Sequence, residues 1–184
     1  SSSSDYTNKN RPTPINSSPD IGAFENDRAQ PFYVKTYVPD DVFEFYLEGQ
    51  GWGDGIAFND SVLTENIAFL TYLDVYGIGI SDMTGIEDFI SLTQLYCFRN
   101  TISSIDLSSN VLLTNLVIAE NDLTELDLSN NTLLTHLEVH DNILDSLDLT
   151  NQPNLIFLRL YNNPPLSFLD LRSGATSPMD MYAT

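Results

Sequence analysis

The sequence predicts a repeat solenoid, a β-rich fold in which short strands stack as a parallel sheet and little helix is present. Three observations predict it. A unit of 21 residues recurs along most of the chain, aliphatic and polar residues alternate within each unit, and an asparagine follows each alternating segment. Alternation with a period of two is typical of a strand that buries one face. Because a single strand cannot bury that face alone, we expect the copies to stack.

The repeated unit is defined by columns of residues 21 positions apart. Its first half carries aliphatic residues at three columns, and its second half carries an aspartate between two further aliphatic residues. An earlier copy starts at Leu70 and has 22 residues, and Pro164 and Pro165 add one residue to the last copy, which shifts its aspartate to Asp170. The clearest copies begin at Leu92, Leu113, Leu134 and Leu155.

The unit L-x-x-L-x-L-x-x-N-x-L-x-x-L-D-L-x-x-N resembles the bacterial leucine-rich repeat family, in particular a 21-residue subclass. The resemblance covers about residues 70 to 171, and the first copy, with "ISDMTGIEDFISL", looks like the internalin-type variant. It implies a leucine-rich repeat solenoid with its parallel sheet on a concave face. It also implies a secreted or cell-surface bacterial protein, and a role in binding other proteins.

A column of asparagines lies where the chain turns inward after each strand. The side-chain amide can bond backbone groups that the bend would otherwise leave buried and unpaired, so a structural role is expected. The first copy has Ile78 or a neighbouring glycine at this position, which predicts an irregular turn. The column consists of Asn100, Asn121, Asn142 and Asn163.

The chain is expected to contain three regions. Residues 1–30 are rich in Ser, Asn and Pro, as linkers are, and "DIGAFE" at residues 20–25 resembles the end of a right-handed parallel β-helix domain. We therefore expect a linker or the remnant of a preceding domain there. Residues 31–69 are expected to form an N-terminal cap, and residues 70–184 the repeats, with a truncated C-terminal end at which "MDMYAT" opens another strand.

The cap is expected to include a short amphipathic helix within "YVPDDVFEFYLEGQGWGDG". Asp40 or Asp41 can cap its start and Gly49 can end it. Phe43, Tyr46 and Leu47 would line one face and, against the first repeat, shield its apolar edge from water.

Charge excludes several classes of partner. The chain has 26 acidic and 7 basic residues and a formal net charge of -19, which repels phosphate backbones and anionic lipid. Nucleic-acid binding is therefore not expected. The sequence shows neither a long apolar run nor a basic, apolar-cored leader, so no membrane span or signal peptide is expected in it.

The functional candidates are the strand residues between the core leucines, because they point away from the core. Aromatic side chains gather at the two ends of this predicted face, and smaller or polar ones lie between them, an arrangement suited to anchoring a ligand. Arg99 and Arg159 can receive a carboxylate of a ligand, or simply pair with Glu120 and Glu138. The candidates are Tyr72, Asp74, Tyr76, Gln94, Tyr96, Phe98, Arg99, His136, Glu138, His140, Phe157, Arg159 and Tyr161.

The segment "HLEVH" contains both histidines of the chain. If it is a strand, the bases of the His136 and His140 side chains lie ~13 Å apart and cannot hold one metal ion together. Neighbouring strands instead place Glu138 beside Arg159 and His140 beside Tyr161. An ion pair and an aromatic row are therefore expected there, and no metal.

No catalytic site is expected, because no carboxylate stands apart from the repeat columns with a partner acid, base or nucleophile. The aspartate column is expected to bond backbone N–H groups of the turns, which favours the ionised form. A string of calcium ions along it is the alternative, and no other cofactor is expected. Asp54 and Asp60 could also offer oxygens to a cation, although an ordinary turn is expected there. The column consists of Asp106, Asp127 and Asp148.

The lone cysteine, Cys97, falls in an aliphatic column and is expected to pack as a small hydrophobic residue.

The sequence thus favours a non-catalytic binding or adhesion module of a larger secreted or cell-surface bacterial protein, recognising a protein partner through the concave face. Two alternatives stay open: a carbohydrate-binding accessory domain of a polysaccharide-active enzyme, with a polysaccharide as the partner, and a structural spacer.

Overall fold

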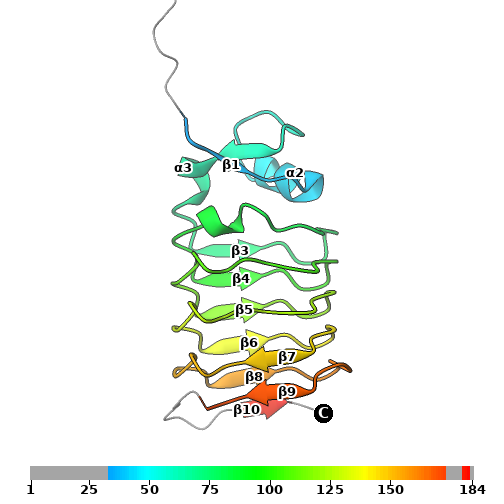
Figure 1. Cartoon of the computed structure of the whole chain (residues 1–184). Coiled ribbons are helices and arrows are strands. Elements are labelled where there is room, and N and C mark those ends of the chain that lie inside the picture. Colours follow the sequence, from blue (N-terminus) through cyan, green and yellow to red (C-terminus); the bar gives the residue numbers. More distant parts are fainter. Residues whose placement is uncertain (1–32, 173–179, 183–184) are drawn as a thin grey trace, which may run out of the picture. The chain divides into compact units, whose positions relative to one another are not determined.

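A computed structural model describes residues 33–172 and 180–182 of the chain. The chain divides into two compact units, Ser1–Tyr33 and Val34–Thr184. The predicted linker at residues 1–30 and its "DIGAFE" segment lie outside the described residues. Within the second unit the predicted solenoid of stacked parallel strands, with little helix, is confirmed (Figure 1).

The main sheet has six parallel strands in the described residues, ordered β10-β8-β6-β5-β4-β3. Each strand pairs with the equivalent residues of the next copy, so that Gln94, Asn115, His136 and Phe157 lie opposite one another in turn. The strand predicted near the C-terminal end is present as β10. The strands are β3 (Tyr72–Asp74), β4 (Gln94–Tyr96), β5 (Asn115–Val117), β6 (His136–Glu138), β8 (Phe157–Arg159) and β10 (Asp180–Tyr182).

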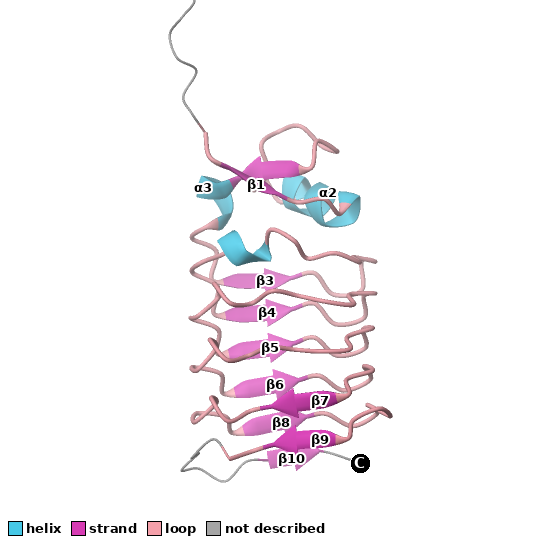
Figure 2. Ribbon diagram, viewed as in Figure 1, coloured by secondary structure: helices cyan, strands magenta, loops and turns pink. Residues whose placement is uncertain are grey.

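A second, two-stranded parallel sheet forms from the other half of the last repeats. It pairs β7 (Ser146–Asp148) with β9 (Phe168–Asp170). These two strands lie on the opposite side of the stack from the main sheet (Figure 2). Asp148 lies opposite Asp170, as predicted from the extra residue at Pro164 and Pro165.

The core consists mainly of the aliphatic columns, which are buried from Leu73 to Leu158 except at Ile105, which is partly buried. Burying one leucine side chain stabilises the fold by about 1.5–3 kcal/mol, so the repeated columns supply most of the driving force. Cys97 is fully buried among them, as predicted, and burial raises the pKa of its thiol.

Each asparagine of the column bonds backbone groups of two consecutive repeats. The Nδ2 of Asn121 donates to the carbonyl oxygen of Ile118 in its own turn (3.2 Å) and to that of Cys97 in the preceding turn (3.0 Å). Its Oδ1 accepts from the backbone N–H of Ile102, also in the preceding repeat (3.0 Å). Asn100, Asn142 and Asn163 make the equivalent bonds. The amide thus binds each repeat to the one before it.

The turn of the first copy is irregular, as predicted. It has no asparagine of its own, and Asn100 of the next copy accepts from the backbone N–H groups of Gly79 (2.9 Å) and Ile80 (3.0 Å). Gly79 has a φ of 94°, a left-handed value that glycine adopts without strain.

The N-terminal part of this unit packs on the first repeat. It comprises β1 (Lys35–Tyr37), α2 (Asp41–Gly49), β2 (Ser61–Leu63), which is antiparallel to β1, and α3 (Thr64–Ile67); the 3₁₀ helix η2 (Ile86–Asp88) follows in the first repeat. The predicted helix is confirmed, with Asp40 as its N-cap. One carboxylate oxygen of Asp40 makes this cap. The other accepts from the backbone N–H groups of Ser81 and Asp82 in the first repeat. Phe43 is fully buried and its ring stacks on that of Phe89 at 6.1 Å.

No helix within residues 33–172 and 180–182 is long and apolar enough to span a membrane.

Replacing Asn142 with alanine is expected to lower the free energy of unfolding by about 1–3 kcal/mol. The buried amide of Leu123 would lose its partner, and the carbonyls of Ile118 and Val139 would each lose one of their two asparagine donors. Chemical denaturation followed by circular dichroism measures the change. Asn130→Ala removes an exposed asparagine of the preceding repeat and serves as the matched control, with an expected change within about 0.5 kcal/mol. Equal losses in the two variants would contradict a role for the buried amide.

Candidate functional site

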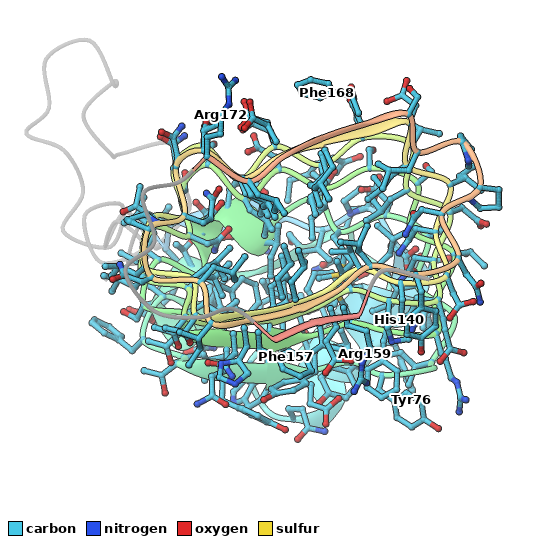
Figure 3. All side chains as sticks on the ribbon, turned by 90° about the horizontal axis from the view of Figure 1, so that it is seen from below. Tyr76, His140, Phe157, Arg159, Phe168 and Arg172 are labelled. Atoms are coloured by element: carbon cyan, nitrogen blue, oxygen red, sulfur yellow. The ribbon has the colours of Figure 1, made fainter. Side chains whose placement is uncertain are left out.

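We call the outward side of the six-stranded sheet the concave face. In β4, β5, β6 and β8 the middle residue is buried and the residues on either side of it are half-buried, because alternate side chains leave opposite sides of a strand. Seen along the stack, Tyr76, His140, Phe157 and Arg159 lie together on one side, and Phe168 and Arg172 lie on the opposite side (Figure 3).

The candidate aromatic residues form pairs across neighbouring repeats, of which three are stacked and one, Tyr72 with Tyr96, is tilted. Their ring centroids lie 4.4 to 5.6 Å apart, within the range in which aromatic pairs attract. One group lies at the β3–β4 end and the other at the β6–β8 end. The pairs are Tyr72 with Tyr96, Tyr76 with Phe98, His136 with Phe157, and His140 with Tyr161.

Strand β5 separates the two groups with smaller side chains. Asn115 and Val117 are half-buried, and Ala119 is buried. The face therefore presents two aromatic surfaces with a lower, partly polar strip between them.

The charged candidates pair with one another. Arg159 donates from Nη1 to Glu138 Oε2 at 2.9 Å, and its guanidinium lies 5.3 Å from the centroid of the Phe157 ring. Arg99 donates from Nε to Glu120 Oε2 at 2.7 Å. The predicted pairs of Arg99 with Glu120 and of Arg159 with Glu138 are thus present.

The two histidines have different partners. The Nδ1 of His136 lies 3.0 Å from the hydroxyl of Thr135. His140 is buried, with Nδ1 2.8 Å from an Asp141 carboxylate oxygen and Nε2 3.4 Å from Glu138. The two imidazole rings thus contact different polar groups.

Asp74 is the candidate whose surroundings the sequence did not reveal. Its carboxylate accepts from the Tyr72 hydroxyl and from the Tyr76 backbone N–H, both at 3.2 Å. The Tyr46 hydroxyl of α2 donates to the Asp74 carbonyl oxygen at 2.8 Å. A tyrosine on an otherwise apolar helix face needs a hydrogen-bond partner for its hydroxyl, and that was the signal that could have placed Tyr46 at this site.

The aspartate column lies on the other side of the stack. Asp106, Asp127 and Asp148 each accept from the backbone N–H two residues later, at 2.8 to 2.9 Å. Bonds from the hydroxyl and N–H of Ser108 lower the pKa of Asp106 below its ordinary value, and those from Ser129 do the same for Asp127. These bonds are the ones expected from the sequence.

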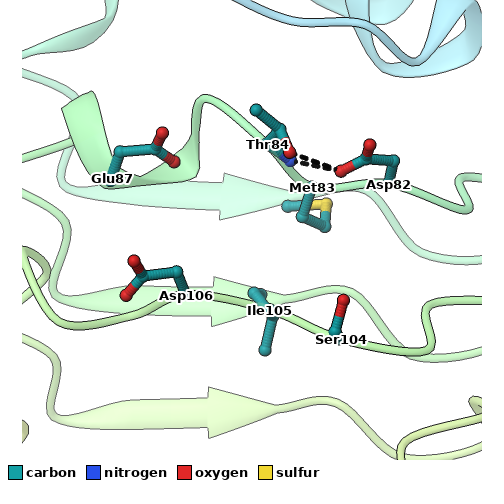
Figure 4. A pocket seen from close by; sticks show the side chains of 7 residues that line it. All are labelled: Asp82, Met83, Thr84, Glu87, Ser104, Ile105 and Asp106. Carbon is teal, nitrogen blue, oxygen red and sulfur yellow. Dashed lines mark hydrogen bonds between the residues drawn. The ribbon is translucent and has the colours of Figure 1, made fainter.

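A pocket of about 360 Å³ opens beside this column, between the first two repeats (Figure 4). Its acidic groups are Asp82, Glu87 and Asp106. Each carboxylate accepts from a nearby backbone N–H, since Asp82 binds Thr84 and Glu87 binds Gly85. These three carboxylates thus stabilise the turns in which they lie.

The acidic residues of the N-terminal part also bond its loop. Asp54 accepts from Lys35 Nζ at 2.6 Å and from the backbone N–H of Ile56 at 2.9 Å. Glu44 is buried and accepts from the backbone N–H groups of Asn59 and Asp60. Oxygens of Asp41, Glu44 and Asp60 lie within 4.8 Å of one another, the one such group of metal-type ligands in the described residues.

No protein-family model matches the sequence. Internalin J of Listeria monocytogenes is 47% identical over 51 residues, which are 28% of this chain and 6% of internalin J. A solved structure described as the functional domain of InlJ from the same organism has a TM-score of 0.57 and 30% identity, and the match covers 76% of this chain and 36% of that chain. An internalin (inlF) structure has a TM-score of 0.58 and 26% identity, over 72% of this chain and 43% of that chain.

The chain therefore spans less than half the length of either solved structure. The InlJ domain is described as including a cysteine ladder, whereas this chain contains a single cysteine.

The stability of this chain is expected to fall in acid partly because of Asp127. Its folded-state pKa lies below the unfolded value of about 3.9, so the ionised form contributes stability that is fully present above that value. This contribution is lost as the pH falls through the lower folded-state pKa. Asp127→Asn removes this titration. The difference in free energy of unfolding between wild type and variant should shrink from about pH 5 to about pH 3 in denaturation experiments. A difference that does not depend on pH would contradict this account.

Chelation is expected to leave the stability unchanged, because the aspartates of the column already accept backbone N–H bonds. Thermal melting with EDTA, and with added calcium chloride, measures this directly. An increase in melting temperature with calcium that Asp127→Asn abolishes would favour the calcium alternative instead.

Proposed function

We propose that the chain, whose repeats and fold resemble those of bacterial leucine-rich repeat proteins, is a non-catalytic binding module of a larger secreted or cell-surface protein, recognising a protein partner through the concave face. Leucine-rich repeats most often bind proteins, which is a family-level reason for a protein partner. The resemblance to internalin J and to the two internalin structures supports the same proposal.

The observation that carries the proposal is the pair of aromatic surfaces on the concave face. Large, rigid aromatic side chains are the residues that contribute most often to the energetic centre of protein interfaces. Tyr76 is 46% exposed and its ring is stacked on that of Phe98, so it presents apolar area in a fixed position. Little side-chain entropy is then lost on binding.

The backbone supports this pre-organisation. Leu95, Leu116 and Leu137 lie directly beneath the face and are fully buried. Densely packed interiors resist deformation, so the strands hold the spacing of the outward side chains. A partner would meet a surface whose geometry is set before contact.

The self-paired charges favour specificity over a large gain in affinity. Arg159 with Glu138 and Arg99 with Glu120 lie at the surface, where such pairs contribute about 0–1 kcal/mol. A partner with a different charge arrangement would leave these groups mismatched, which disfavours it.

A double variant, Phe98→Ala with Tyr161→Ala, tests the proposal. The purified chain would be screened against an array of defined extracellular proteins and, in parallel, a glycan array. We expect at least one protein to bind, and the double variant to weaken that binding at least about tenfold, or about 1.4 kcal/mol.

The matched control is Phe168→Ala, which removes a 55% exposed aromatic side chain from the opposite side of the stack and is expected to leave binding unchanged. All variants should show the wild-type circular dichroism spectrum. Binding to glycans alone would support the carbohydrate alternative. A concave-face site would be contradicted if the control lost protein binding, or if the double variant bound the protein as tightly as the wild type.

A further inference from the structure

Asp74 lies within a group of three tyrosines at the β3 end of the concave face. The Tyr72 hydroxyl bonds its carboxylate and the Tyr46 hydroxyl bonds its carbonyl oxygen. The Tyr72 ring is 5.5 Å from that of Tyr96, on the neighbouring strand. We call Tyr46, Tyr72, Asp74 and Tyr96 the Asp74 cluster. It joins α2 of the cap to the first two strands of the sheet.

The carboxylate of this cluster retains acceptor capacity. Asp74 is exposed, and each of its oxygens accepts one hydrogen bond, Oδ1 from the Tyr76 N–H and Oδ2 from the Tyr72 hydroxyl. An ionised carboxylate offers about four acceptor positions. Both oxygens can therefore accept a further donor without losing their present bonds.

No basic residue of the described part of the chain pairs with Asp74. The basic residues that the structure describes each pair with another carboxylate: Lys35 with Asp54, Arg99 with Glu120, Arg159 with Glu138, and Arg172 with Asp170. The pKa values of Tyr46 and Tyr72 are both raised, mainly by burial and next by the negative charge of Asp74. The phenols thus stay neutral hydrogen-bond donors.

The other end of the same face shows the arrangement with a cation in place. There the Arg159 guanidinium bonds the Glu138 carboxylate and lies over the Phe157 ring. Asp74, Glu138 and Arg159 occupy the same outward column of the sheet. A carboxylate beside aromatic rings in this column is thus compatible with a guanidinium.

We propose that the Asp74 cluster binds an arginine side chain of a protein partner. The carboxylate would accept two parallel N–H bonds from the guanidinium, and the Tyr72 and Tyr96 rings would contact its flat face. Arginine fits better than lysine, because its planar fork matches a carboxylate and stacks on aromatic rings. Cation–π contact with the rings would add to this preference.

The charge of the whole chain supports a basic partner. A net charge of -19 attracts cationic surfaces over the distance of the Debye length, so a basic partner would associate faster at low salt. That attraction is general, whereas the Asp74 cluster fixes one position. This inference rests on the proposed function, because it names the chemistry that the concave face would recognise.

The test uses the peptide acetyl-Gly-Arg-Gly-amide as the probe. Titration into the full chain with ¹³C-labelled tyrosine is followed by the ring signals of Tyr72 and Tyr96 in nuclear magnetic resonance spectra. We expect saturable shifts of both signals. The same peptide with citrulline, a neutral near-isostere of arginine, should produce none, and the lysine peptide should bind more weakly.

Asp74→Asn is expected to weaken the binding of the arginine peptide at least tenfold. Asp122→Asn removes the same charge from an exposed position outside the concave face and is expected to preserve the affinity. This control separates the site from general attraction to an acidic protein. Tyr96→Leu should also weaken binding, whereas Phe168→Leu, on the opposite side of the stack, should not. Thermal melting of each variant verifies its fold.

Equal affinity in wild type and Asp74→Asn, equal binding of the citrulline peptide, or no saturable shift would overturn the proposal. The two proposals can fail separately. A protein partner lost with Phe98→Ala and Tyr161→Ala but indifferent to Asp74→Asn would preserve the proposed function and refute the arginine site. Binding of the arginine peptide at Asp74, with no protein bound by the concave face, would support the arginine site and refute the proposed function.

Discussion

The asparagine amides of the turns are the interaction on which the rest of the structure depends. A solenoid turn buries backbone groups that no strand partner can reach, and an unsatisfied buried group costs about 1–3 kcal/mol. Asn121 bonds the turn of its own repeat and the turn before it. The hydrogen bonds of each turn therefore require the neighbouring turn. Burial of the leucines and pairing of the backbone groups thus favour the same register of stacking.

That register determines what the concave face can present. Because copies stack with equivalent residues opposite one another, side chains 21 residues apart become neighbours, as His140 and Tyr161 do. Aromatic residues placed in consecutive copies must then stack, and a small residue such as Ala119 must leave a low strip. The pattern of the face follows from the choice of one residue in each copy.

The scarcity of basic residues gives the few carboxylates on this face different roles. Glu138 is neutralised by Arg159, and Glu120 by Arg99, whereas the acids on the other side of the stack accept backbone N–H groups. Asp74 combines an exposed carboxylate with tyrosine rings. Its position in the first repeat, beside α2, gives it the additional contact with Tyr46.

The sequence by itself determined the strands of the main sheet, their register, the buried columns and the pairs His140–Tyr161 and Arg159–Glu138. It could do so because a stack of equal units turns a period in sequence directly into contact in space. Only the tertiary structure decided which neighbouring turn each asparagine serves and that Tyr46 reaches Asp74. It also decided that a pocket opens beside Asp106. The sequence from β1 to α3 has no period, and its contacts with the first repeat depend on how a helix packs against an edge, so no column of the sequence encodes them.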